Sequence, residues 1–195
     1  YLYDEFPYDI YVEITSTKFI KAIAKNTKYT QGDIQKYVKQ RVKHFYIKKD
    51  EQLDFLEQTI QKCSMQIQTL PNGIELTKTH IISFSVLQSY VSNFGVTQTV
   101  QELIELLIDS IPESCKDKQL TEIINDFPFS NGGVAVKGVF VAYVCDQLLR
   151  AMEWNARSSK GKMIIASILH DAFIDNDDLS KITQLDDEAF TSLSL

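Results

Sequence analysis

Near the start of the chain, hydrophobic and polar residues alternate. Farther along, the hydrophobic residues recur at the spacing of a helix. From Tyr8 to Ile14 every second residue is apolar, which is typical of a strand with one buried face. Thr15 or Ser16 can then cap a helix that runs to Ala24. The apolar positions of this predicted helix are Phe19, Ile20 and Ile23. A second helix is predicted next, and its apolar stripe comprises Ile34, Tyr37, Val38 and Val42.

The following apolar segments predict a second strand and a long helix. His44 to Ile47 is short, aromatic and β-branched, and lysines flank it. Asp50 can cap a helix whose apolar positions recur at helical intervals, namely Leu53, Leu56, Ile60, Cys63 and Ile67. The order strand, helix, helix, strand, helix predicts two parallel strands in a small sheet that helices cover.

Pro71, followed by Asn72 and Gly73, is the clearest break in the pattern, because it combines a helix-stopping residue with a turn-forming pair. We place a domain boundary here, with a small α/β domain over residues 1–70 and an all-α domain over residues 71–195. The predicted fold class is therefore α+β overall. One predicted helix of the second domain carries a broad apolar stripe, made of Val100, Leu103, Ile104, Leu107, Ile108 and Ile111.

Composition narrows the function classes. With 44% hydrophobic and 24% charged residues among 195, the chain has the composition of a folded globular protein. Its net charge of -6 argues against general nucleic-acid binding, which needs an excess of Lys and Arg. The three cysteines form no CxxC pair and indicate the cytosol. No apolar run is long enough for a membrane span, and the acidic N-terminus is unlike a signal peptide. The chain begins with Tyr1, which leaves open that it is a piece of a longer protein.

The adjacent residues His170 and Asp171 are the main candidates for chemistry. They close an apolar helical pattern, and imidazole nitrogen together with carboxylate oxygen suits iron, manganese or zinc. In a two-metal hydrolase such a carboxylate can bridge both ions. The alternative is a structural pair, in which the histidine donates to a carbonyl and the aspartate caps the next turn.

The segment around this pair, ASILHDAFIDNDDLSKI, resembles the His-Asp segment of the HD phosphohydrolase superfamily. The stretch VKGVFVAYVCDQLLRAMEW resembles the preceding helix of the HD-GYP branch, the bacterial cyclic di-GMP phosphodiesterases. The resemblance implies that the all-α domain is HD-like and that His170 and Asp171 would bind iron or manganese.

The chain also departs from the family pattern. Alignment on the apolar run puts Lys137 where the family has its first metal-binding histidine, and Gly138 where it has a serine. The family's GYP segment and later ligands should follow the His-Asp pair, but the chain stops at Leu195. A lysine ammonium has no lone pair for a metal, so Lys137 is a candidate for binding a ligand instead.

These observations lead to three hypotheses. The first is a cytoplasmic bacterial signalling protein whose degenerate HD-GYP-like domain acts by binding cyclic di-GMP or a signalling protein, because too few ligands remain for catalysis. The second is a metal-dependent cyclic di-GMP phosphodiesterase whose remaining metal ligands lie in segments absent from this chain. The third is a dimeric helical scaffold that pairs through the stripe on residues 97–111.

Overall fold

The computed structural model describes residues 5–15, 17–40, 42, 44–127, 133–154 and 156–170. The chain forms two compact units, Tyr1–Thr59 and Ile60–Leu195. A small N-terminal β-hairpin region precedes a mostly helical domain, so the predicted α+β class is confirmed.

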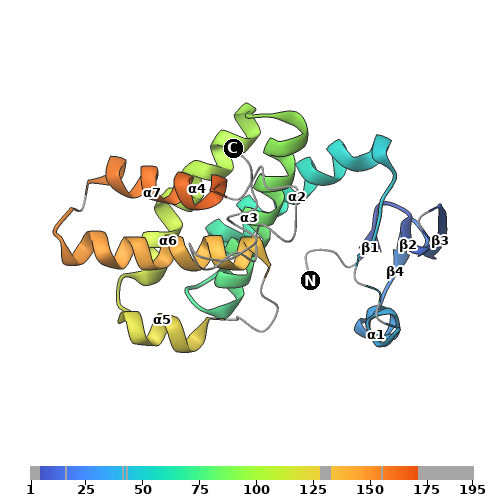
Figure 1. Cartoon of the computed structure of the whole chain (residues 1–195), viewed down its shortest axis with the longest axis horizontal. Coiled ribbons are helices and arrows are strands. Elements are labelled where there is room, and N and C mark those ends of the chain that lie inside the picture. Colours follow the sequence, from blue (N-terminus) through green and yellow to red (C-terminus); the bar gives the residue numbers. More distant parts are fainter. Residues whose placement is uncertain are drawn as a thin grey trace, which may run out of the picture. The chain divides into compact units, whose positions relative to one another are not determined.

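The N-terminal unit is built on an antiparallel hairpin (Figure 1). Strands β2 (Ile10–Thr15) and β3 (Lys18–Ile23) pair with Ile10 opposite Ile23 and Val12 opposite Ile20. Two shorter strands, β1 (Glu5–Phe6) and β4 (Thr27–Lys28), pair with each other, and helix α1 (Gln31–Lys39) follows. Tyr46 joins the other edge of β2 through a single bridge to Tyr11.

The helix predicted up to Ala24 is wrong, because residues 18–23 form strand β3. Its few apolar positions fit both a helical and an extended period, and β2 is close enough in sequence to pair with it through a tight turn. The predicted parallel pairing of the first strand with a second strand at His44 to Ile47 is also wrong, because Tyr46 forms only a single, antiparallel bridge to Tyr11 of β2.

One face of the hairpin is buried. Ile10, Val12 and Ile23 are each at most 8% exposed, and Leu56 is 4% exposed. Tyr8 is 3% exposed, donates a 2.6 Å hydrogen bond to Asp54 and packs edge-on against the ring of Phe55. These contacts connect the hairpin to the start of helix α2 (Gln52–Thr69), which follows the short 3-10 helix η1 (Lys49–Glu51).

Helix α2 ends at Thr69, immediately before the predicted break at Pro71. The division by contacts falls earlier, between Thr59 and Ile60 within α2. Glycine at position 73 adopts a positive φ of 156° at the start of α3 (Ile74–Phe94), and Gly95 ends that helix with a φ of 80°.

The helical unit continues with α4 (Gln98–Cys115), α5 (Leu120–Asp126), α6 (Val134–Ala151) and α7 (Arg157–Leu169). The side chain of Thr97 caps α4 by accepting from the Val100 amide, and Gln119 with Glu122 forms a capping box on α5. Helix α6 packs against α3, α4 and α7. Among the residues that the structure describes, no helix combines the length and the hydropathy needed to span a bilayer.

The apolar stripe of α4 forms the core of this unit. Val100, Leu103, Leu107 and Ile111 are all 0% exposed, and Ile108 is 6% exposed. The third hypothesis placed a dimer interface on this stripe. That placement is wrong, because the stripe is buried against α3, α6 and α7 within a single chain.

Candidate functional site

Helices α6 and α7 form the frame of the candidate site. They are consecutive, are joined by a short connection and lie side by side (Figure 1). Gly138, near the start of α6, lies against the end of α7, where a Cβ on this glycine would be 2.9 Å from the Ser167 carbonyl oxygen. The two helices are therefore antiparallel, and the first turns of α6 meet the last turn of α7.

His170 is the C-cap residue of α7 and is exposed. Its Nδ1 lies 2.8 Å from the Ser167 carbonyl oxygen. A carbonyl can only accept, so Nδ1 carries the proton and the imidazole lone pair is on Nε2. This tautomer is the one that metal-binding histidines commonly use. Asp171, the other half of the predicted pair, lies outside the described residues.

Lys137 lies in the first turn of α6 and is exposed. It immediately precedes Gly138, which touches the same Ser167 carbonyl that holds His170. The α6 start and the α7 end thus bring the two predicted site residues to one end of the helix pair. In the part of the chain that the structure describes, no group of three or more His, Cys, Asp or Glu side chains has the arrangement of a metal site.

Helix α3 supports this end of the pair. The side-chain amide of Gln88 donates a 3.0 Å hydrogen bond to the carbonyl of Ile168. Phe84, which is 0% exposed, lies 3.1 Å from the position that a Cβ on Gly138 would take. These contacts hold the last turn of α7 through its backbone, so the position of His170 depends on the core and not on surface side chains.

His80 lies in α3 and is 0% exposed, although a lysine and a threonine precede it in the sequence. Its Nδ1 lies 2.8 Å from the hydroxyl of Tyr143, and its Nε2 lies 2.9 Å from the hydroxyl of Ser110. Burial lowers the pKa of His80 from 6.5 to about 3. The imidazole is therefore a neutral link between α3, α4 and α6, and it is not at the α6–α7 end.

The sequence contained a signal for this burial. His80 lies four residues after Leu76 and four before Phe84, and both of these are core residues. A position on the apolar face of a helix predicts a buried histidine with hydrogen-bond partners.

A second buried polar group is Asp146, whose side chain is 1% exposed. Its carboxylate lies 2.6 Å from Arg150 Nε and 3.3 Å from Lys160 Nζ. Arg150 also donates a hydrogen bond to the carbonyl of Pro112 in α4. Lys160, near the start of α7, is therefore part of an ion cluster with Asp146 and Arg150 of α6.

The described cysteines in the core are not nucleophiles. Burial raises the pKa of Cys115 to about 12, and it also raises the pKa of Cys63. Both thiols stay protonated at neutral pH, so neither provides a reactive thiolate.

Acidic side chains line a groove in the same unit. Its volume is about 870 Å³, and α4 contributes Glu102, Glu105 and Asp109. The carboxylates of Glu105 and Asp109 bind the guanidinium of Arg157, and these ion pairs raise the pKa of Arg157.

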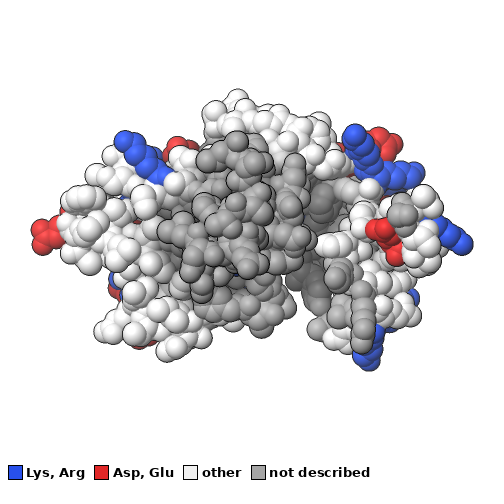
Figure 2. All heavy atoms as spheres, in the orientation of Figure 1, with Lys and Arg blue, Asp and Glu red and all other residues white. Residues whose placement is uncertain are grey.

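Figure 2 shows Lys and Arg on the described part of one face as small separate groups interspersed with Asp and Glu.

Comparison of the chain with protein-family models, with curated proteins and with solved structures finds no match. The relation to HD-GYP domains therefore remains a prediction from the residues around His170 and Lys137.

Proposed function

We propose that this chain is a cytosolic bacterial signalling protein whose helical unit is a degenerate HD-GYP-like domain. In this proposal the unit works by binding an anionic ligand such as cyclic di-GMP, or a signalling protein, and it does not hydrolyse a phosphodiester. The binding site is the α6–α7 end, where Lys137 and His170 lie and from which the chain continues to Asp171.

The observation that carries the proposal is the close approach of Gly138 to the Ser167 carbonyl oxygen, which would be 2.9 Å from a Cβ at this position. Because His170 donates to that carbonyl, Lys137 and His170 both flank this contact. An ammonium group at one end of a helix pair suits a phosphate group, which accepts hydrogen bonds from it. The Nε2 atom of His170, whose Nδ1–H is used by Ser167, can accept a hydrogen bond from an N–H group of the same ligand.

Ligand counting favours binding over catalysis. A dinuclear centre needs several imidazoles and carboxylates, and the resemblance aligns Lys137 with one of the histidines. A lysine at neutral pH offers no electron pair to a metal and repels a dication nearby.

Metal reconstitution tests this proposal. The purified chain would be incubated anaerobically with Fe²⁺ or Mn²⁺, and the bound metal would be measured after desalting. We expect little metal in the wild type and a gain toward about one ion per chain in Lys137→His, which restores an imidazole. The gain should disappear in the double variant with His170→Ala. Two tightly held ions in the wild type would refute the degenerate assignment.

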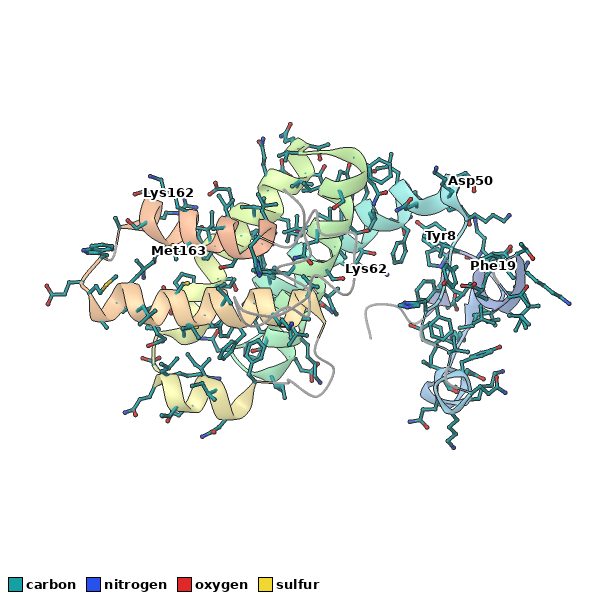
Figure 3. The ribbon with its side chains drawn as sticks, in the orientation of Figure 1. Tyr8, Phe19, Asp50, Lys62, Lys162 and Met163 are labelled. Carbon is teal, nitrogen blue, oxygen red and sulfur yellow. The ribbon has the colours of Figure 1, made fainter. Side chains whose placement is uncertain are left out.

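Calorimetry with cyclic di-GMP tests the ligand. We expect Lys137→Glu to weaken binding at least tenfold, because an attractive charge becomes a repulsive one. Lys162→Glu is the matched control, since Lys162 is also an exposed lysine but lies in the middle of α7, about two helical turns before His170 (Figure 3). Equal loss in both variants would show that only overall charge matters.

A metal-dependent phosphodiesterase is the second candidate, and one observation favours it. The hydrogen bond from His170 Nδ1 to Ser167 puts the lone pair on Nε2, as a ligand requires. This function needs further ligands from segments that this chain does not contain. Hydrolysis of cyclic di-GMP by a metal-reconstituted longer protein that contains those segments, lost in His170→Ala, would establish this second candidate and reject the first.

A further inference from the structure

The N-terminal unit has aromatic side chains on the face of its sheet that is opposite the core. In an antiparallel pair, residues directly opposite each other share a face, so Glu13 and Phe19 lie on one face together with Tyr11. Tyr46 pairs with Tyr11 and belongs to the same face. Ile10 and Val12 lie on the other face and are buried. The outer face of such a sheet is normally polar, so these rings need an explanation.

The rings line a cleft, which we call the aromatic cleft. Its volume is about 360 Å³, and its lining residues are Tyr11, Phe19, Tyr46, Ile47 and Lys48. The rings of Phe19 and Tyr46 meet edge to face with centroids 5.1 Å apart. Phe19 is 46% exposed and stands on the hairpin (Figure 3), so its ring still has surface available for stacking.

Two groups of opposite charge accompany the rings. Lys48 is exposed and contributes to the wall of the cleft. Glu13 accepts a 2.8 Å hydrogen bond from the hydroxyl of Tyr46, which places its carboxylate beside the cleft. A ligand that matches this set has a flat ring, an anionic group and N–H donors.

We propose that the aromatic cleft binds a single nucleotide. The base stacks on Phe19, the phosphate pairs with Lys48, and N–H groups on the edge of the base donate to Glu13. The volume of about 360 Å³ is at the small end of the range for small-molecule sites and suits one base with its sugar. A polynucleotide is a poorer match, because the chain has a net charge of -6.

This inference is independent of the function proposed for the helical unit. The cleft residues all belong to Tyr1–Thr59, whereas Lys137 and His170 belong to Ile60–Leu195. A Lys137→Glu variant should therefore keep mononucleotide binding, and a Phe19→Ala variant should keep any effect of Lys137.

Calorimetry on the full chain with GMP, AMP, CMP and UMP at millimolar concentrations tests the inference. We expect saturable binding of one nucleotide, weaker binding of the matching nucleosides that lack phosphate, and a preference for bases with adjacent N–H donors. Loss of the stacking ring in Phe19→Ala should weaken binding about tenfold to a hundredfold. Ile20→Ala is the matched control, because Ile20 is 42% exposed in the same strand and lies on the other face.

A second pair of variants tests the phosphate contact. Lys48→Glu should remove the advantage of a nucleotide over its nucleoside, whereas Lys49→Glu should keep it, because Lys49 does not line the cleft. Absence of saturable binding for all four nucleotides would overturn the inference, as would equal affinity in wild type and Phe19→Ala. Much tighter binding of a single-stranded RNA hexamer than of any mononucleotide would overturn the assignment to a single nucleotide.

Discussion

Acidification from pH 7 to pH 5 should weaken the helical unit, because His80 is buried as a neutral imidazole. Its pKa is about 3 in the folded chain and about 6.5 in an unfolded one, so the unfolded state takes up the proton first. The stabilising effect of the neutral form is complete above pH 6.5 and is lost as the pH falls toward 3. Between pH 7 and pH 5 this difference lowers the free energy of unfolding by about 2 kcal/mol.

The measurement is urea unfolding followed by circular dichroism at pH 7 and pH 5, on wild type and His80→Gln. Glutamine cannot titrate, so the stability difference between the two proteins should shrink by about 2 kcal/mol at the lower pH. His44→Gln serves as control, because it leaves His80 in place and should keep the wild-type loss. If His80→Gln loses as much stability as wild type on acidification, the buried imidazole is not the cause and the reasoning fails.

Two further predictions concern packing and buried charge. Gly138→Ala should destabilise the helical unit by about 1–3 kcal/mol, because its Cβ would meet the Ser167 backbone oxygen at 2.9 Å. Gly161→Ala should cost less by the same chemical denaturation, since its Cβ would meet only a movable side chain at 3.3 Å. Asp146→Ala should cost about 3 kcal/mol because it leaves two partly buried cations, Arg150 and Lys160, without their shared carboxylate, whereas Arg157→Ala should cost at most about 1 kcal/mol because its ion pairs are exposed. Equal costs for the two glycines, or for the two charged residues, would contradict these expectations.

The helical unit was predictable because its helices are long. A stripe such as that of α4 repeats over several turns, so its period identifies both the helix and its buried face. The hairpin was not predictable, because residues 18–23 are too few for their pattern to distinguish a strand from a helix. The choice there depended on pairing with β2, which supplies backbone hydrogen bonds that a single segment does not encode.

The candidate site was predictable only in part. His170 and Lys137 were identified from a resemblance, and their arrival at one end of a helix pair depends on the close approach of α6 and α7 at Gly138. Nothing in the residues next to His80 indicated that Tyr143 and Ser110 would meet its ring, since those partners come from two other helices.

The amino-acid sequence alone determined the α+β class, the helical character of the second unit and the identity of its buried stripe, because these follow from periodicity within one segment. Tertiary structure alone decided that β3 is a strand, that hydroxyl groups of two other helices pair with the ring of His80, and that three aromatic rings line one cleft together with Lys48. Each of these depends on groups distant in sequence that compete for burial and hydrogen bonds, and that competition is settled only when the segments pack together.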